Sequence, residues 1–237
     1  MEYSEVFSTW RELCKAEWDS YTKHLFVERI RNGTLPKTAF LTYLKQDYIF
    51  LKHFSRAWGL AIVKSDSITD MHTCSKVVHA LLNEEINLHI EFCNNEGIPT
   101  KELEETNEMN QNLAYTRFVL DTGYSGDFLD LMAALAPCVF GYGEIGMRIG
   151  ASQYSAVYKE WINTYAGSDY QSLCFEVGNL IDNSVIRTLG ENYSTLGKFQ
   201  ELTHKFKTAT LLERDFWEMA DISVSYTHLT LPTTPYV

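Results

Sequence analysis

Proline is scarce in this 237-residue chain, with five residues, two of them among the last six positions. Proline ends or kinks helices, so its scarcity permits long ones. Apolar residues recur at the three- and four-residue spacing of helices and do not alternate as they do in half-buried strands. Helical segments with short connections predict an all-α bundle and argue against a parallel sheet with crossover helices.

The glycine-rich signatures of nucleotide-binding proteins are missing from the positions that would give them meaning. No Walker motif occurs, and the one GxGxxG match, at 141–146, continues an apolar helical segment and does not join a strand to a helix, so dinucleotide and nucleoside triphosphate chemistry have no support. Cysteine is limited to five scattered residues without a CxxC pair, which argues against a zinc finger or a disulfide framework. Residues 1–7 are polar and charged, unlike a signal peptide. Both observations favour a cytoplasmic protein.

Basic side chains are fewer than acidic ones. The chain has 20 Lys and Arg and 31 Asp and Glu, which gives a formal net charge of −11. Such a surface repels phosphate groups, so neither nucleic acid nor an anionic membrane is an expected partner. No window is expected to cross a membrane, since the longest apolar run, 129–143, is shorter than a bilayer requires. The 14 tyrosines favour a polar, aromatic-lined cavity.

Periodicity and stop signals divide most of the chain into helices. The expected helices are 4–23, 38–64, 67–96, 112–122, 126–151, 154–165, 168–189 and 194–221. The acidic segment 101–109 is expected to be solvated. Together these elements predict one domain over residues 1–222.

Residues 223–237 differ in composition from the rest of the chain. They contain no Asp, Glu, Lys or Arg and are rich in Thr and Pro. After a long acidic, helical sequence, this composition is typical of a segment outside the fold. We interpret it as a non-native or unstructured tail, added by cloning or read-through. A genuine extended C-terminal strap is the alternative.

The apolar segment 128–150 is expected to form a buried core helix around which the other helices pack. Pro137 at its centre removes a backbone donor and should kink or loosen the helix. Cys138 follows at once, so a thiol occupies the place where helical hydrogen bonding is broken. Cys138 is therefore either a small buried hydrophobic residue or a nucleophile in a pocket.

Asp47 lies on an aromatic helix face. It shares one stripe of the expected helix with Tyr43, Phe50 and Phe54. A carboxylate on such a face points inward and must be paired, hydrogen-bonded or neutral. Asp47 is thus a candidate site residue, and the alternative is a structural bond to a neighbouring helix.

Glu213 occupies a similar position on the last helix, where it shares a face with Phe216 and Trp217. The alternative for Glu213 is a solvated helix charge. Glu85 and His89 lie four residues apart, so they can share a metal ion or a hydrogen bond. A di-iron site is not expected, because it requires Glu-x-x-His on two helices.

Taken together, these stretches resemble one family, the TenA-type thiaminase II proteins, which have a heme-oxygenase-like all-helical fold. The Pro-Cys helix and the Glu-x-x-Phe-Trp-x-Met-Ala ending are the specific motifs. The matching pieces, in the family's order, are His24-Leu25-Phe26, Gly33-Thr34-Leu35-Pro36, Phe40-x-x-Tyr43-x-x-Gln46-Asp47, Glu85-x-x-x-His89, Tyr115, Ala134-Leu135-Ala136-Pro137-Cys138-x-x-Gly141-Tyr142-x-x-Ile145-Gly146, Trp161-Ile162-x-x-Tyr165 and Glu213-x-x-Phe216-Trp217-x-Met219-Ala220.

The resemblance implies an activity and a set of roles. Members with a catalytic Cys release 4-amino-5-hydroxymethyl-2-methylpyrimidine by hydrolysis of thiamin or of its 5-aminomethyl salvage product, without cofactor or metal. By positional match, Cys138 is the nucleophile, Glu213 the acid at the ring nitrogen and Asp47 the carboxylate at the exocyclic amine. A carboxyl group in an aromatic pocket has a raised pKa, which would help Glu213 donate a proton. The family also implies a homotetramer.

Four aromatic residues complete the implied site. Tyr165 would form an aromatic wall, Tyr115 would hold Glu213, and Tyr142 would line the pocket near the nucleophile. Taken alone, each tyrosine is more typical of core packing. Phe50 departs from the family, because many members carry Tyr there and gain a hydroxyl that reaches the acid.

Two other classes of function stay open. One is a different activity on the same fold, such as a cofactorless oxidase of the PqqC type or a heme oxygenase, for which His24 is the sole nearby candidate ligand. The other is a non-enzymatic pyrimidine-binding regulator, although the net charge of −11 disfavours direct DNA binding. Such a module would tolerate Cys138→Ser, and a hydrolase would not.

Overall fold

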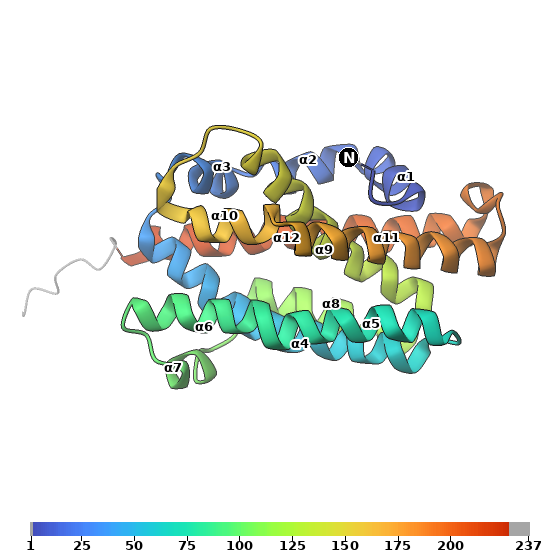
Figure 1. Ribbon diagram of the computed structural model, residues 1–237, viewed down its shortest axis with the longest axis horizontal. Coiled ribbons are helices and arrows are strands. Elements are labelled where there is room, and N and C mark those ends of the chain that lie inside the picture. Colours follow the sequence, from blue (N-terminus) through green and yellow to red (C-terminus); the bar gives the residue numbers. More distant parts are fainter. Residues whose placement is uncertain (1, 228–237) are drawn as a thin grey trace, which may run out of the picture.

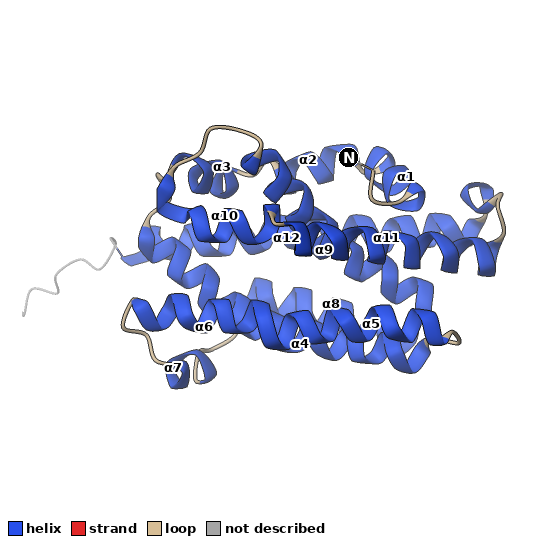
Figure 2. Ribbon diagram, viewed as in Figure 1, coloured by secondary structure: helices blue, strands red, loops and turns tan. Residues whose placement is uncertain are grey.

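The computed structural model of the chain describes residues 2–227, and regular secondary structure in that part is helical throughout, which confirms the all-α prediction (Figures 1 and 2). The elements are α1 Glu5–Leu13, α2 Lys15–Thr22, α3 Leu25–Asn32, α4 Lys37–Lys64, α5 Ile68–Ala80, the π-helix η1 Leu81–Glu85, α6 Ile86–Asn95, α7 Thr100–Glu104, α8 Asn110–Ser125, α9 Phe128–Gly150, the short η2 Ala156–Tyr158, α10 Lys159–Ala166, α11 Ser168–Leu189, η3 Tyr193–Thr195 and α12 Gly197–Thr227.

Helix α9 is the centre of the bundle. It packs against α12, α10, α8, α11, α4 and α2. Figure 1 shows α4, α5 and α6 along one side of the molecule and α10 and α11 along the other, with α9 crossing between these two sides. The expected role of 128–150 as the organising core helix is therefore confirmed. Every side chain that α9 presents to a neighbour is positioned by contacts on several sides.

The start of α9 is determined by a capping box. The side chain of Asp127 accepts a hydrogen bond from the backbone of Asp130, and the side chain of Asp130 accepts one from the backbone of Asp127. Lys198 on α12 also bonds the Asp130 carboxylate. The helix begins two residues later than expected and continues through Pro137, whose missing N–H leaves one carbonyl without its helical donor.

One expectation about α9 was wrong. The helix has 23 residues and is long and apolar enough to cross a membrane by length and composition, although no window was expected to be. Its apolar window is 89% buried inside the protein, however. Packing against the neighbouring helices therefore accounts for the apolar run, as in the core helix of a globular domain.

Glycine lets other elements approach α9 closely. A Cβ placed on Gly146 would lie 2.4 Å from the backbone carbonyl carbon of Tyr165 on α10. One placed on Gly141 would lie 2.2 Å from the ring of Tyr21 on α2. Both helices thus contact the bare backbone of α9, which brings Tyr21 near Cys138 and the Tyr165 ring against Tyr142.

Several expected helix boundaries were wrong at the N-terminal end. The helix expected over 4–23 is divided at Cys14, whose backbone leaves the helical conformation with φ −111 and ψ 29. An unexpected helix, α3, follows; the side chain of His24 caps its start, and Gly33 with φ 70 ends it. Short connections without Pro or Gly gave no signal for these breaks.

Further differences concern the middle of the chain. The helix expected over 67–96 contains the π-helix η1, and the expected helix 154–165 is the turn η2 followed by α10. The segment 101–109, expected to be solvated, contains α7, which buries Leu103 completely. Helix α4 agrees within one residue with its prediction, and α11 has the predicted ends.

The predicted tail begins inside the last helix. Helix α12 extends to Thr227, beyond the expected end at 221, and residues 228–237 lie outside the described residues. The single domain over 1–222 and the foreign origin of 223–237 therefore stay predictions.

Candidate active site

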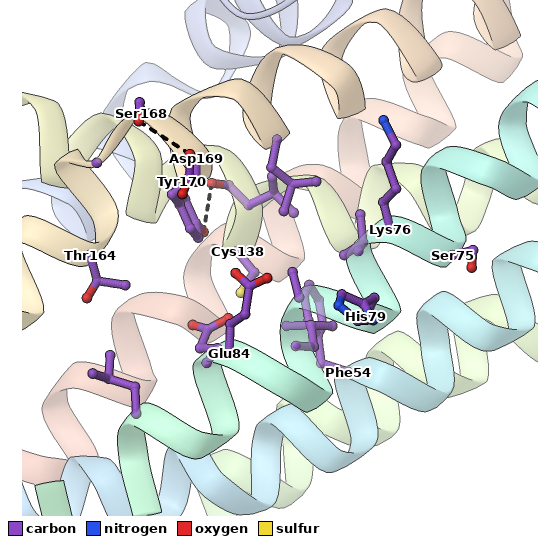
Figure 3. A pocket seen from close by; sticks show the side chains of 18 of the residues that line it. Phe54, Ser75, Lys76, His79, Glu84, Cys138, Thr164, Ser168, Asp169 and Tyr170 are labelled. Carbon is purple, nitrogen blue, oxygen red and sulfur yellow. Dashed lines mark hydrogen bonds between the residues drawn. The ribbon is translucent and has the colours of Figure 1, made fainter. Parts of the chain in front are cut away.

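A cavity of about 820 Å³ lies between α5, η1 and α6 on one side and α9, α10 and α11 on the other. Cys138 on α9 and Glu85 on η1 both line it, and Figure 3 shows Cys138 near the centre of the view. Glu213 and Asp47 are not part of this wall and are buried behind it, at 2% and 3% exposure. The Cys138 thiol therefore lies between the cavity and the buried carboxyl groups of Glu213 and Asp47.

Glu213 is the buried partner of the thiol. Its Oε1 accepts a hydrogen bond of 2.8 Å from the Tyr115 hydroxyl, and its carboxyl group also interacts with Cys138 and Tyr21. Burial raises the pKa of Glu213 to about 8, and the negative charge of Asp47 adds to this, against the lowering effect of the Tyr115 hydrogen bond and of the neighbouring Cys138 and Tyr21 groups. The expected direction of this pKa shift is confirmed.

The Cys138 thiol lies in surroundings that disfavour its ionisation. Burial raises its pKa well above the usual value, and the carboxyl groups of Glu213, Glu85 and Asp47 raise it further. Cys138 is therefore a neutral thiol, in contrast to the low-pKa thiolates found beside cations. Ionisation has to be coupled to removal of the proton by a neighbouring group.

Asp47 is the acceptor of a buried hydrogen-bond network. Its Oδ2 lies 2.7 Å from Nε2 of His89 and accepts a bond of 3.1 Å from the Tyr43 hydroxyl. The Tyr43 oxygen in turn accepts bonds from Trp161 Nε1 at 3.2 Å and from the Tyr142 hydroxyl at 3.4 Å. The network fixes the orientation of the Asp47 carboxylate and links it to Tyr142.

His89 binds two acceptors at once. Its Nδ1 lies 2.8 Å from the backbone oxygen of Glu85, and its Nε2 faces Asp47. A neutral imidazole can donate only one of these bonds, so both are made by an imidazolium. Burial lowers the pKa of His89, but the hydrogen bond to Asp47 and the negative charges of Asp47 and Glu85 together outweigh it, and the pKa is raised. Asp47 is therefore the carboxylate of a buried ion pair.

The sequence analysis missed Glu85 as a site residue. Its Oε1 accepts a hydrogen bond of 2.7 Å from the Tyr165 hydroxyl. Burial raises its pKa to about 7, with a further contribution from Asp47. The pair Glu85 and His89 was the available signal, but the two side chains bind different partners. Among the described residues, no group of three or more His, Cys, Asp or Glu could hold a metal ion.

The aromatic residues named from the sequence gather around these polar groups. Tyr142 and Tyr165 have ring centroids 4.8 Å apart, and Tyr165 lies equally far from Trp161. The Phe50 ring lies 4.8 Å from that of Tyr115, so a hydroxyl on Phe50 would be near the partner of Glu213. Seven residues were predicted for the site, and the structure brings all of them into one buried region: Asp47, Phe50, Tyr115, Cys138, Tyr142, Tyr165 and Glu213.

Other participants were also missed. Tyr21 on α2 interacts with Glu213, Tyr43 on α4 donates to Asp47, and Trp161 on α10 donates to Tyr43. Tyr43 was visible on the stripe of Asp47, whereas nothing in the sequence linked Tyr21 or Trp161 to the site. His24, the candidate heme ligand, uses its Nδ1 to accept a bond from the backbone N–H of Phe26 at the start of α3.

Comparisons with known proteins agree with this geometry. The profile of the TENA/THI-4/PQQC family matches residues 12–221. An uncharacterized Haemophilus influenzae protein is 37% identical over 206 residues, which cover 85% of this chain and 92% of that protein. The aminopyrimidine aminohydrolase of Halalkalibacterium halodurans is 34% identical over 207 residues, which cover 86% of this chain and 89% of that enzyme.

A solved structure extends the agreement to the fold. The crystal structure of a TenA family transcription regulator from Silicibacter sp. TM1040 matches with a TM-score of 0.90 and 51% identity, and the match covers 92% of this chain and 97% of that chain. The predicted TenA-like, heme-oxygenase-like helical fold is confirmed. Because the family profile spans most of the sequence and these relatives align over nearly their full length, the chain belongs to the TENA/THI-4/PQQC family.

Proposed function

We propose that the protein is an aminopyrimidine aminohydrolase of thiamin salvage, which releases 4-amino-5-hydroxymethyl-2-methylpyrimidine from the 5-aminomethyl pyrimidine and from thiamin. The observation that carries the proposal is the pairing of the Cys138 thiol, at the wall of a cavity, with the buried and protonated carboxyl group of Glu213. The name of the Halalkalibacterium relative supports the same substrate class.

The first step adds the thiol to the pyrimidine ring. Glu213 is protonated at neutral pH and donates its proton to the ring nitrogen, which makes the adjacent carbon electrophilic. The resulting carboxylate removes the proton of Cys138 as sulfur bonds to that carbon. The S–H bond is replaced by an S–C bond, and Glu213 ends the step as a neutral acid. A free thiolate is never required.

The second step expels the group on the 5-methylene. The exocyclic amine of the ring donates its electron pair, the bond from the methylene to the leaving group breaks, and an exocyclic alkene forms. We assign Asp47 to the N–H of that amine, which becomes more acidic as positive charge develops on it. Oδ2 of Asp47 is held by His89 and Tyr43, so Oδ1 is the oxygen for the substrate.

The last step adds water to the alkene: the water oxygen bonds to the methylene, one water proton passes to solvent in the cavity, and the alkene electron pair returns to the ring and its exocyclic amine, after which sulfur leaves with the S–C bonding pair. The S–C bond breaks, the aromatic ring is restored and Cys138 regains its proton from Glu213, which takes one from the ring nitrogen. Glu213 and Asp47 lie behind the cavity wall, so the pyrimidine ring has to widen the cavity beside Cys138 when it binds. The rings of Tyr142 and Tyr165 are placed to stack with it.

The test is the direct assay of product release. Purified protein is incubated with the 5-aminomethyl pyrimidine and, separately, with thiamin, and the hydroxymethyl pyrimidine is measured by chromatography. Formation of this product from at least one substrate supports the proposal. A correctly folded protein that releases it from neither, and that binds the pyrimidine without turnover, would instead be a binding protein.

A further inference from the structure

We propose that Glu85 is a second catalytic acid, which holds a proton on the leaving nitrogen while the bond between this nitrogen and the 5-methylene breaks. This inference rests on the proposed function and adds a residue and a substrate-dependent role to it.

Cys138 lies between two carboxyl groups. Glu213 faces it from the buried side, and Glu85 lines the same cavity as the thiol from the π-helix η1. A pyrimidine ring bound with its ring nitrogen at Glu213 presents its 5-methylene away from that carboxyl group. The leaving group has to depart through the cavity, and Glu85 lies on the wall of this cavity.

The Glu85 side chain is fixed in place. The Tyr165 hydroxyl donates to Oε1, and His89 binds the backbone oxygen of the same residue. Both bonds come from residues already in the site network, so side chain and backbone are held together. The π-helix matters here, because its wider turn changes the direction of the side chains that follow and is frequent at functional sites. In the described hydrogen bonds the Glu85 carboxyl group uses Oε1, which leaves Oε2 for a ligand.

Protonation of Glu85 is consistent with this role. Burial raises its pKa to about 7, and the charges of Asp47 and Glu84 raise it as well. The charge of His89 and the Tyr165 hydrogen bond lower it. A group with this balance exchanges its proton readily near neutrality, as a general acid must.

The step is balanced for an amine leaving group. Glu85 and the amine of the substrate share one proton, and this proton is on nitrogen when the C–N bond breaks. The bonding electron pair goes to nitrogen and ammonia leaves. Glu85 is then a carboxylate. A thiazolium leaving group departs as neutral thiazole and needs no proton. The role of Glu85 is therefore specific to substrates with an amine leaving group, whereas Cys138 and Glu213 serve both.

The experiment compares Glu85→Gln with the wild type on both substrates. We expect kcat for the 5-aminomethyl pyrimidine to fall by about 100-fold or more and kcat for thiamin to change by less than about fivefold. The exposed neighbour Glu91, changed to Gln, is the matched control and should leave both rates unchanged. Glu85→Asp retains an acid and should restore part of the amine-dependent rate.

Each outcome is decisive. An equal loss on the two substrates would show that Glu85 only supports the structure, and no loss on either would show that it takes no part; both results overturn the inference and leave the hydrolase proposal intact. A wild-type protein that cleaves neither substrate would remove the proposed function itself. If Glu85→Gln does not fold, Glu85→Asp is tested alone, and equal losses on both substrates in that variant would overturn the inference.

Discussion

The Cys138 thiol on α9 interacts directly with the Glu213 carboxyl group on α12, so the proposed nucleophile and its proposed proton acceptor are paired before any substrate binds. Burial raises the pKa of both groups. The pair therefore holds two protons at neutral pH and is ready to transfer one to a basic ring nitrogen while the other leaves sulfur.

The pH dependence of the rate follows from this pairing. For thiamin, whose cleavage does not use Glu85, Glu213 has to be protonated to start the reaction, and its pKa is about 8, so kcat/KM for thiamin should fall about tenfold per pH unit above that value. Glu213→Gln should lower kcat by about 100-fold or more and abolish this dependence. A pH–rate profile measures it. A rate that instead rises with pH above 8, as a thiolate nucleophile would give, contradicts the account.

The same group makes stability depend on pH. Glu213 keeps its proton up to about pH 8 in the folded state but only up to about 4.5 when unfolded. Between these values the folded state carries the extra proton, so the free energy of unfolding falls as the pH rises, by about 1.4 kcal/mol per pH unit for this group.

Urea denaturation at about pH 5.5 and about pH 7.5 measures this slope. The Glu213→Gln variant has no carboxyl proton to lose at this position. The free energy of unfolding of this variant should therefore change less steeply with pH, by the contribution of the one Glu213 carboxyl group. An unchanged slope in the variant would show that Glu213 ionises at its ordinary pKa in the folded protein.

Phe50→Tyr should raise turnover. The Phe50 ring lies beside Tyr115, which donates to Glu213, so an added hydroxyl can reach the acid. One hydrogen bond worth about 1 kcal/mol corresponds to roughly a fivefold increase in kcat. Steady-state kinetics with the wild type in parallel test this. Unchanged or lower kcat in a folded variant counts against the role assigned to this position.

Gly146→Ala should destabilise the protein. The added Cβ would lie 2.4 Å from the backbone of Tyr165, so α10 has to move away from α9, at a cost of about 1–3 kcal/mol. The shift also displaces Tyr165 and should raise KM. Gly59→Ala on α4 is the matched control, because its Cβ has no atom within 4 Å and alanine favours helix. Equal unfolding midpoints for the two variants would contradict the packing described here.

Much of the site could be predicted because helical periodicity determines which side chains point inward. Asp47 and Glu213 lie on aromatic stripes, and both are buried as those stripes indicated. The pairing of either residue could not be predicted in this way. Tyr115 and Glu213, or Asp47 and His89, come together only through the packing of different helices.

Glu85 shows a second limit on predicting the site from the sequence. On a regular helix, Glu85 and His89 would point in the same direction, and the sequence analysis read them as a pair. The π-helix Leu81–Glu85 ends at Glu85, and the two side chains have different partners: Glu85 binds Tyr165 and His89 binds Asp47. No composition signal marks such a segment, since its cause is the fit of the helix against its neighbours. The break at Cys14 was missed for the same reason.

The measurement that tests the central claim most directly is kcat/KM for the 5-aminomethyl pyrimidine with wild type and Cys138→Ala, alongside their circular dichroism spectra. The alanine variant removes the sulfur without a new polar group in a buried position. The account predicts product release by the wild type and a loss of about 1,000-fold or more in a variant with an unchanged spectrum, since Cys138 is the only cysteine among the described residues that line the cavity. A folded Cys138→Ala variant that retains most of the wild-type rate would contradict it.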